Sequence, residues 1–351
     1  MSNMGAPCVL VSRRPSRPDS VSPSRWKLLI ALSGLALLAA VLAPTAMADN
    51  GGFTPVAPES PNAEGIRDSF LFVSIFVVGI LVLVEGLLIA FIVRYRRQKR
   101  ARFEDGAQVH GATKLELLWT AFPVVVLALI AAFVFVELPG IKNVPAAGAS
   151  GQLEIKVTGR QFYWQFEYPN GVVAIDAMAA PAGVPVRLEV TAPDADVVHS
   201  WWIPALGGKI DAIPGTVNET WFQAETPGTY TGQCAELCGL EHAQMLATVE
   251  VLPEAEFGAW LEGRREAQSA GTGELGKELW EGVCAKCHGL TGEGGIGPRI
   301  AGSLTLSDAT AVEDLVRNGR GAMPAVGSEW TDEQILALTN YLKENPPSGG
   351  S

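Results

Sequence analysis

The sequence predicts a multidomain membrane protein, in which a two-helix transmembrane hairpin is followed by an all-β domain and then by an all-α domain. Two apolar runs, at about residues 70–93 and 117–136, are each long enough to cross a bilayer as a helix. From Leu153 onward, apolar and polar residues alternate in short runs broken by Pro and Gly, which is typical of strands in a sandwich or barrel. Beyond residue 273, helical periodicity surrounds a Cys-x-x-Cys-His motif.

Residues 1–48 are expected to be a secretory signal peptide. Scattered arginines precede the apolar stretch 28–42, and Ala46-Met47-Ala48 supplies the small residues of a cleavage site. We therefore expect cleavage after Ala48. The alternative is a retained extra span, which is less favoured because the apolar stretch is short for a bilayer.

Residues 49–145 are expected to form the transmembrane hairpin, whose two spans are joined by a loop at 94–116. The first span would be about 36 Å long as a helix. A basic cluster directly follows it, so the positive-inside rule assigns the loop to the cytoplasm and both ends of the hairpin to the outer face. Glu85 lies inside the first span and is expected to face a protein partner or to be tolerated at a helix contact. The basic cluster consists of Arg94, Arg96, Arg97, Lys99, Arg100 and Arg102.

The rest of the chain is expected to contain two further domains. The boundaries are 146–253 for the β domain, 254–272 for a connecting helix and flexible joint, 273–346 for the helical domain and 347–351 for a tail. Strands are expected at 153–157, 184–190 and 248–251. Helices are expected at 254–268, 276–280, 309–318 and 331–344, and the residues of the joint are 269–273. Thr331 and Gln334 have the spacing of a capping box at the start of the last helix.

A dense group of metal-ligand residues lies between positions 234 and 245. Two thiols, an imidazole and a thioether fall within this one loop, and a second imidazole, His199, lies upstream. Sulfur ligands with imidazole select copper, zinc or iron, and the His, Cys and Met set is that of copper electron-transfer sites. A mononuclear copper site of this kind uses two histidines, one thiolate and a weak Met ligand, so the second thiolate would have no role. The extra thiolate suggests two copper ions. A structural zinc site or a disulfide beside a histidine are the alternatives.

Two copper ions could be bridged by both thiolates. Cys234 and Cys238 would each contact both ions, and His199 and His242 would each bind one of them. Weak outer ligands would come from the Met245 thioether and a backbone carbonyl, for which that of Glu236 is the candidate. Sharing one electron between two ions in a stiff loop keeps the geometry nearly constant between redox states, which suits fast electron transfer.

The last domain carries the attachment motif of a c-type haem. Cys284 and Cys287 are expected to form the thioethers, and His288 is expected to be the proximal ligand. Met323 is the candidate sixth ligand, because a soft ligand is needed to hold a high potential. The domain resembles a small class I cytochrome c, including Gly297-Pro298, and this resemblance implies that the Pro298 carbonyl accepts a hydrogen bond from the His288 ring. A redox-active dithiol is the alternative interpretation of the two cysteines.

Composition sets limits on the partners. The formal net charge is −11, and residues 141–351 alone carry 13 Lys and Arg against 27 Asp and Glu. An acidic exported surface favours basic partners and argues against nucleic acid. Four of the five cysteines belong to the two motifs above, so no disulfide framework is implied.

The loop Cys-x-Glu-x-Cys-Gly-x-x-His-x-x-Met, together with Val198-His199-Ser200-Trp201, resembles the binuclear copper (CuA) site of subunit II of haem–copper cytochrome c oxidase. With the strand pattern, this resemblance implies a cupredoxin-like Greek-key domain. The helical domain resembles a small class I cytochrome c. The two resemblances cover about residues 60–255 and 273–346, and together they indicate the branch of oxidases whose subunit II carries a fused C-terminal cytochrome c.

The resemblance implies a function. The chain would pass electrons from its own haem c to the CuA centre and on to the haems of subunit I, where oxygen is reduced to water with proton translocation. It would be competent as a ferrocytochrome c:oxygen oxidoreductase only with subunit I. Subunit III, and a quinol–cytochrome c reductase or a c-type cytochrome as donor, are the other implied partners. The implied location is the bacterial cell membrane, with both soluble domains on the outer face.

The resemblance also assigns roles to single residues. The Glu236 carboxylate matches a ligand of a magnesium ion shared with subunit I, and Glu116 matches the carboxylate at the mouth of a proton path. The alternative for Glu116 is an ordinary acid at a helix start. Two residues depart from the family pattern, which has Trp where this chain has Phe162 and commonly Arg where it has Thr216. The first departure puts docking of a free cytochrome c in doubt. The second puts in doubt part of the hydrogen bonding near the propionates of the subunit I haem.

Two other functions are compatible with a copper loop. One is the copper component of a nitrogen-oxide reductase, against which the two spans with Glu116 argue. The other is a membrane-anchored copper-delivery or assembly protein, which would have no use for the covalent haem implied by Cys284, Cys287 and His288.

Overall fold

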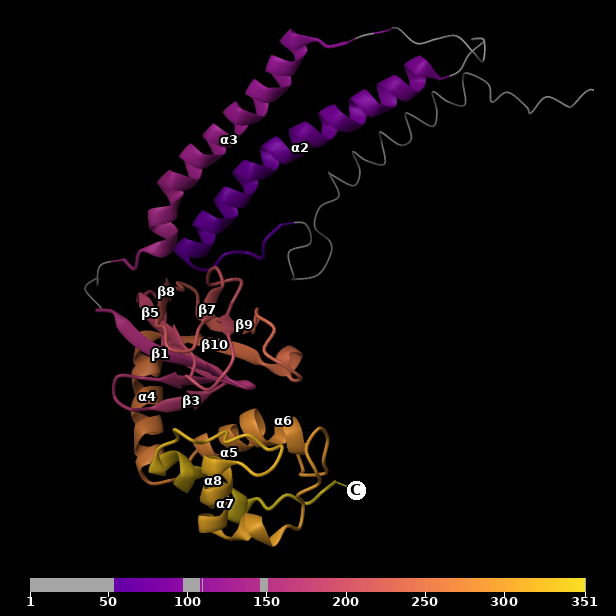
Figure 1. Ribbon diagram of the computed structural model, residues 1–351. Helices are drawn as coiled ribbons and strands as arrows, with labels where there is room; N and C mark the ends of the chain where they lie inside the picture. The colour runs from indigo at the N-terminus through magenta and orange to yellow at the C-terminus, as the bar shows by residue number, and fades with distance from the viewer. Residues whose placement is uncertain (1–53, 97–107, 109, 146–150, 351) are drawn as a thin grey trace, which may run out of the picture. The chain divides into compact units, whose positions relative to one another are not determined.

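The structure is a computed structural model that describes residues 54–96, 108, 110–145 and 151–350. The expected signal peptide, residues 1–48, and most of the expected cytoplasmic loop lie outside the described residues. Within these described residues, two long helices are followed by ten strands and then by the helices of the last domain (Figure 1). This order confirms the predicted sequence of a helical hairpin, an all-β domain and an all-α domain.

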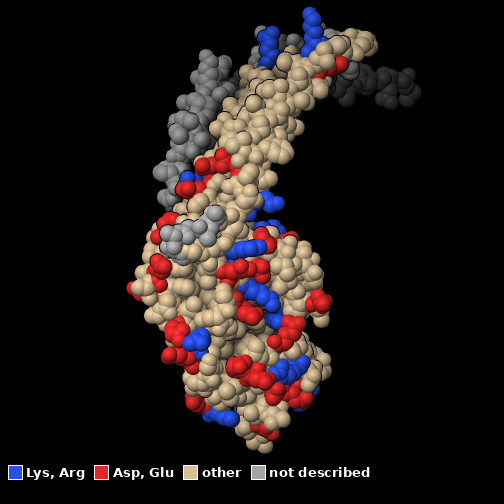
Figure 2. Space-filling view, turned by 90° about the vertical axis from the view of Figure 1, so that its left-hand side faces the viewer, with Lys and Arg blue, Asp and Glu red and all other residues tan. Residues whose placement is uncertain are grey.

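The helical hairpin consists of α2 (Pro61–Tyr95) and α3 (Thr113–Lys142). Both are long and apolar enough to cross a membrane, and both extend beyond the predicted spans. They contact each other through stacked rings of Phe72 and Phe133, whose centroids are 4.1 Å apart. Figure 2 shows one face of the hairpin almost without charged side chains over much of its length, as a lipid-facing surface requires.

The outer ends of the hairpin are hydrogen-bonded to the β domain. The Asn62 side chain donates to the carbonyl of Trp221 at 2.6 Å, and the Trp221 indole donates to the carbonyl of Ile141 at 3.0 Å. Because Asn62 and Ile141 belong to different helices, one tryptophan of the β domain contacts both ends of the hairpin.

The β domain is built from a five-stranded sheet, a three-stranded sheet and a two-stranded ribbon. The strand orders are β3-β2-β1-β5-β8, β4-β10-β9 and β6-β7. The pairs β1·β5 and β10·β4 are parallel and the other pairs are antiparallel. The strands are β1 (Leu153–Arg160), β2 (Tyr163–Glu167), β3 (Val173–Ile175), β4 (Ala177–Pro181), β5 (Val186–Thr191), β6 (His199–Trp201), β7 (Ile210–Ala212), β8 (Asn218–Phe222), β9 (Gly228–Gln233) and β10 (Leu246–Leu252).

The three predicted strands correspond to β1, β5 and β10, with ends shifted by up to three residues. In β5 and β10 the apolar residues of the period-two pattern are the buried ones, as expected for strands with one face toward a core. The core contains large rings, of which Trp164 and Trp201 meet edge to face with centroids 5.4 Å apart.

The last domain consists of helices joined by turns. They are α5 (Leu275–Leu279), α6 (Ala285–His288), α7 (Ala309–Asn318) and α8 (Asp332–Glu344), with a π turn at Trp280–Cys284 and a 3-10 turn at Leu304–Ser307. The connecting helix α4 (Glu254–Ser269) precedes this domain, and another 3-10 turn, His242–Gln244, lies in the metal-ligand loop of the β domain. The predicted capping box is present, because the Thr331 hydroxyl and the Gln334 side chain each accept from the other's backbone N–H.

The joint at 269–273 is packed rather than loose. The Asn340 side chain on α8 donates to the Gly271 carbonyl at 2.8 Å. Gly271 has a positive φ of 67°, and an added Cβ would lie 2.6 Å from Leu336. In the structure, α8 therefore covers a segment whose composition alone is typical of a free linker.

The helical domain shares a hydrophobic core with the β domain. Tyr163, Val173 and Ile175 of the β domain lie in one buried cluster with helical-domain residues that include Trp280 and Trp330. The two domains are thus in direct contact, and the metal-ligand loop and the Cys-x-x-Cys-His motif are held in one packed unit.

Candidate metal centres

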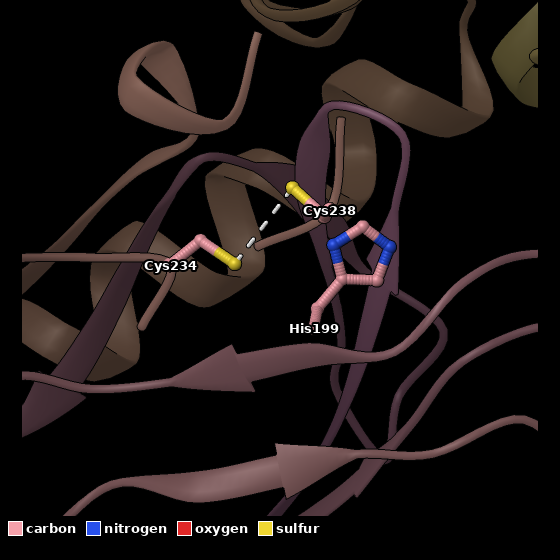
Figure 3. Close-up of side chains that lie close together, drawn as sticks. All are labelled: His199, Cys234 and Cys238. Carbon is pink, nitrogen blue, oxygen red and sulfur yellow. Dashed lines mark hydrogen bonds between the residues drawn. The ribbon is translucent and has the colours of Figure 1, made fainter. Parts of the chain in front are cut away.

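His199, Cys234 and Cys238 come together in the β domain (Figure 3). Their ligand atoms all lie within 4.8 Å of one another, and the two sulfurs are 4.0 Å apart. All three side chains are buried, and His199 has no exposed surface. The His199 Nδ1 atom is buried without a hydrogen-bond partner among the described residues. A buried nitrogen of this kind is costly unless something binds it, so the arrangement fits a metal ion.

The other predicted ligands lie around the same two sulfurs. His242 Nδ1 is 3.6 Å and Met245 Sδ is 3.8 Å from Cys238 Sγ. The Cys234 thiol lies 3.2 Å from the Glu236 carbonyl oxygen. All six predicted residues are therefore gathered in one place. The sulfurs are too far apart for a disulfide, whose S–S bond is about 2.05 Å long.

The loop favours a deprotonated sulfur. The hydrogen bond between the two thiols lowers the pKa of Cys234 to about 3. The same hydrogen bond, with burial, raises the pKa of Cys238. The pair therefore holds one thiolate and shares one proton, which a metal bound to both sulfurs would displace. A set of thiolate, imidazole and thioether ligands suits copper better than zinc.

Asp196 contacts the metal-ligand cluster and was not among the predicted site residues. Its Oδ1 atom is 3.2 Å from His199 Nε2 and accepts from the Val197 N–H at 2.7 Å. Its Oδ2 atom accepts from the Gln161 N–H at 3.1 Å. A carboxylate on the far nitrogen fixes the tautomer and orientation of a metal-binding imidazole. The Asp-x-x-His spacing just before β6 is the sequence signal that could have identified it.

Burial alone would lower the pKa of His199, but its hydrogen bond with Asp196 and its proximity to the Cys234 sulfur outweigh this effect and raise the pKa. For Asp196, burial alone would raise the pKa, but its hydrogen bonds with His199, Val197 and Gln161 outweigh this effect and lower the pKa. Asp196 therefore stays ionised and remains an acceptor for the imidazole.

Replacing Asp196 with Asn is expected to weaken copper binding by about 10- to 100-fold, because the orienting carboxylate is lost while the shape is kept. Copper titration in competition with a chelator measures the change. The matched control is Asp194→Asn, which removes an exposed carboxylate two residues upstream and should leave affinity unchanged. Equal affinity of D196N and the parent would show that Asp196 has no such role.

The helical domain contains a cavity of about 400 Å³ at the Cys-x-x-Cys-His motif. Cys284, His288 and Met323 line it, and most of the other lining side chains are apolar. The volume lies in the range of cofactor sites. His288 Nδ1 is 2.8 Å from the Pro298 carbonyl, which confirms the predicted hydrogen bond. The apolar lining consists mainly of Trp280, Ile300, Leu306, Val312, Leu315, Val316, Leu338 and Leu342.

The cavity fits a haem and the cysteines do not fit a redox dithiol. The motif's histidine and the predicted methionine ligand border the same apolar space. Burial raises the pKa of the Cys284 thiol to about 12 and also raises that of Cys287. A redox-active dithiol needs a thiol of lowered pKa, so the alternative of a thiol oxidoreductase is disfavoured.

Two predicted carboxylates lie outside these centres. Glu116 Oε1 accepts a hydrogen bond from the backbone N–H of Ala112 at 3.1 Å, the geometry of an acid that caps a helix start. The Glu236 carboxylate is half exposed, and its Oε2 atom is 3.9 Å from Lys209 Nζ. Lys209 also lies 3.8 Å from Asp211. Glu236 therefore contributes its carbonyl to the sulfur cluster while its side chain belongs to a surface charge group.

Three family models match the chain. They are described as cytochrome c oxidase subunit II, transmembrane domain, over residues 50–136; cytochrome c oxidase subunit II, periplasmic domain, over 172–252; and cytochrome c oxidase, cbb3-type, subunit III, over 271–342.

Relatives match over most of their length. Cytochrome c oxidase subunit 2 of Alkalihalophilus pseudofirmus is 34% identical over 316 residues, which cover 83% of this chain and 90% of that protein. The protein of the same name from Cereibacter sphaeroides is 35% identical over 269 residues, which cover 65% of this chain and 83% of that protein. The crystal structure of the periplasmic domain of subunit II of cytochrome oxidase from Bradyrhizobium japonicum is 38% identical, with a TM-score of 0.32, and covers 35% of this chain and 97% of that chain.

Proposed function

This chain belongs to the cytochrome c oxidase subunit II family, and we propose that it is the subunit at which electrons enter a bacterial respiratory oxidase. Electrons would be accepted at the chain's own haem c, passed to a binuclear copper centre and delivered to the haems of subunit I. There oxygen would be reduced to water with proton translocation. The chain has only four histidines, and three are assigned to copper and haem, so oxygen chemistry requires subunit I.

The family assignment confirms the predicted fold class of two membrane-capable helices, a cupredoxin-like β domain and a helical cytochrome c domain. It makes the chain a subunit of an oxidase complex, in which it associates with subunit I. The helices and the match to a periplasmic domain indicate a membrane protein with an outer-face domain. The bacterial cell membrane as location, subunit III as a partner, and a quinol–cytochrome c reductase or a c-type cytochrome as donor are proposals.

For the copper centre we propose both thiolates as bridges, with one imidazole on each ion. Cys234 and Cys238 would be the bridges, and His199 and His242 the terminal ligands. The weak ligands would be the Met245 thioether and the Glu236 carbonyl. When bound, a copper pair of this kind takes up and releases single electrons. Asp196 orients one imidazole, and burial of both sulfurs excludes water. This buried, fixed donor set is unlike an exchangeable copper-delivery site.

For the haem we propose thioether bonds to Cys284 and Cys287, with His288 and Met323 as the axial ligands. Pro298 orients the His288 ring through the hydrogen bond at 2.8 Å. The Met323 N–H donates to the Arg320 carbonyl at 3.1 Å, and Arg320 N–H donates back to the Met323 carbonyl at 3.0 Å. This tight turn holds the methionine beside the cavity.

Two assignments are carried from the family resemblance alone. Glu236 would bind a magnesium ion shared with subunit I, and its carboxylate is half exposed beside Lys209. Glu116 would lie at the mouth of a proton path into subunit I. Its hydrogen bond to the Ala112 N–H fits the helix-start interpretation, and the proton role needs the partner subunit to complete the path.

The observation that carries the proposal is the presence of two sites in one packed unit. One is a buried cluster of two sulfurs and the His199 imidazole, with His242 beside it, and the other is a cavity of about 400 Å³ at the haem-attachment motif. The test is oxygen uptake by the purified complex with ascorbate and no added cytochrome c. Uptake is expected, because the chain supplies its own donor domain. A complex that contains copper and haem but requires added cytochrome c for any uptake would contradict the proposed order.

A further inference from the structure

Lys286, between the two cysteines of the haem-attachment motif, is bound to the β domain. Its ammonium donates to the Phe162 carbonyl at 2.8 Å and to Asp176 Oδ2 at 2.5 Å. Both charged side chains are largely buried, with 14% of the lysine side chain and 24% of the aspartate side chain exposed. Asp176 Oδ1 accepts from the Trp164 N–H at 2.8 Å, so each carboxylate oxygen has a partner.

The backbone on both sides is shaped for this contact. Asp176 has a φ of 59°, a left-handed conformation that Asp tolerates better than most residues. Opposite it, a Cβ added to Gly282 would lie 2.8 Å from Ile175 Cγ2 and 3.0 Å from Asp176 Oδ2. The absence of a side chain at Gly282 thus lets the haem-attachment turn approach the end of β3 closely.

Further polar contacts join the two domains on either side of the Gln161-Phe162 segment. The Tyr163 hydroxyl donates to the Val326 carbonyl at 2.9 Å and accepts from the Trp330 indole at 3.0 Å, although Tyr163 has no exposed surface. Arg160 pairs with Glu329 at 2.5 Å. Arg160 and Tyr163, which flank the Gln161-Phe162 pair, therefore also contact the helical domain.

The same segment contacts the copper loop from its other side. The Gln161 side chain donates to the Cys238 carbonyl at 2.6 Å. The Phe162 ring lies against Gly239, where an added Cβ would be 3.0 Å from Phe162 Cε1 and 3.0 Å from Gln161 Nε2. Residues 161–162 thus form a bridge between Lys286 and the residue that carries a proposed copper-bridging thiolate.

We propose that Lys286 is a positioning residue for electron transfer within this chain. It holds the haem-attachment turn against Gln161-Phe162, the segment that also contacts Cys238. The inference rests on the proposed function, because it needs both cofactors. The step it serves moves one electron from reduced haem iron, which is oxidised, to the oxidised copper pair, which is reduced, and no bond forms or breaks. A contact that fixes distance and orientation therefore acts on the rate alone.

The electrostatics suit positioning rather than stabilisation. Burial raises the pKa of Asp176, and the charge of Lys286 offsets only part of that effect. A buried ion pair of this kind is weak evidence for stability, but it has a specific geometry that two separate surfaces must match.

The test measures haem-to-copper electron transfer in the intact purified complex after flash reduction of the haem. Absorbance of the haem and the near-infrared band of the copper pair are followed together. Lys286→Gln is expected to slow transfer at least about tenfold, because small misplacements of reacting groups have large effects on rate. The haem potential and the copper paramagnetic signal should not change. Lys286→Arg, which keeps the charge, should recover most of the rate.

Two further variants make the outcome decisive. The double variant Lys286→Gln with Asp176→Asn leaves no buried charge unpaired, so it removes the contact even where the single variant assembles poorly. The double variant should transfer electrons from haem to copper as slowly as Lys286→Gln does. Lys277→Gln is the matched control, since it removes an exposed ammonium of the same domain that pairs with Glu281 at 3.9 Å, and it should transfer at the parent rate.

The inference is overturned if the double variant transfers electrons as fast as the parent, or if Lys277→Gln slows transfer equally. A failure of the proposed function gives a different result, because the parent itself would then show no transfer from haem to copper.

Discussion

Replacing Cys238 with Ser is expected to abolish the paired copper centre. Cys238 Sγ is the hub of the cluster, with the sulfur of Cys234 at 4.0 Å, that of Met245 at 3.8 Å and the His242 ring at 3.6 Å. A hydroxyl is a poor substitute for a thiolate that binds soft metals. Loss of a direct ligand should exceed the effect of losing an orienting group, so oxygen uptake should fall more than about 100-fold.

Copper content and uptake by the purified complex measure this effect. The control is Ala247→Ser, which also places a hydroxyl at a buried position just beyond the loop and should keep both coppers. Haem content should be normal in both variants, because the haem cavity is in the other domain. A C238S complex with two coppers and normal uptake would contradict the bridging role of this sulfur.

Replacing Met323 with Leu is expected to lower the haem potential. Leu keeps nearly the same volume, so the fold should be preserved, but the thioether that favours a high potential is lost. Axial ligands change haem potentials over a range of about 0.8 V, so a fall of about 0.1 V is a modest expectation. Because about 59 mV is tenfold for one electron, the ratio of reduced to oxidised haem at fixed potential would fall about 50-fold.

Redox titration of the haem, with oxygen uptake from ascorbate alone, checks this expectation. Uptake without added cytochrome c should slow while the copper signal stays intact. Met178→Leu is the matched control, because it makes the same exchange at a buried position of the β domain. If M323L has the same haem potential and the same oxygen-uptake rate as the parent, Met323 is not a haem ligand. The proposed route of electrons through this haem would then also be contradicted.

The sequence was most informative where the chemistry is local. Positions 234 to 245 form one loop, so the spacing alone brings two sulfurs, a thioether and an imidazole close together. The partner of His288, the Pro298 carbonyl, is only ten residues away. The period-two strands and the capping box at Thr331 were also predicted, because each depends on neighbours in the sequence.

Long-range contacts could not be predicted. Lys286 and Asp176 are 110 positions apart, and nothing in either segment indicates that they pair. The segment 269–273 was expected to be flexible from its Gly, Ser and Thr content, which does not reveal that Asn340 and Leu336 of α8 lie against it. Asp196 was within reach of sequence reasoning, since it precedes His199 by three residues.

The packed joint changes the expected benefit of fusing the two domains. A free tether would only raise the local concentration of the donor domain, to about the millimolar range. A shared core that includes Tyr163, Ile175 and Trp330 instead holds the donor in one pose. Fusion then fixes the orientation of the donor domain on the β domain as well as keeping it close.

Metal analysis of the intact purified complex, combined with electron paramagnetic resonance, tests the central claim most directly. The proposed function predicts two copper ions in each chain and a signal from one unpaired electron shared by both nuclei. Zinc in their place, or a single copper ion in each chain with its electron on one nucleus, would contradict the assignment of the sulfur cluster and the route of electrons through it.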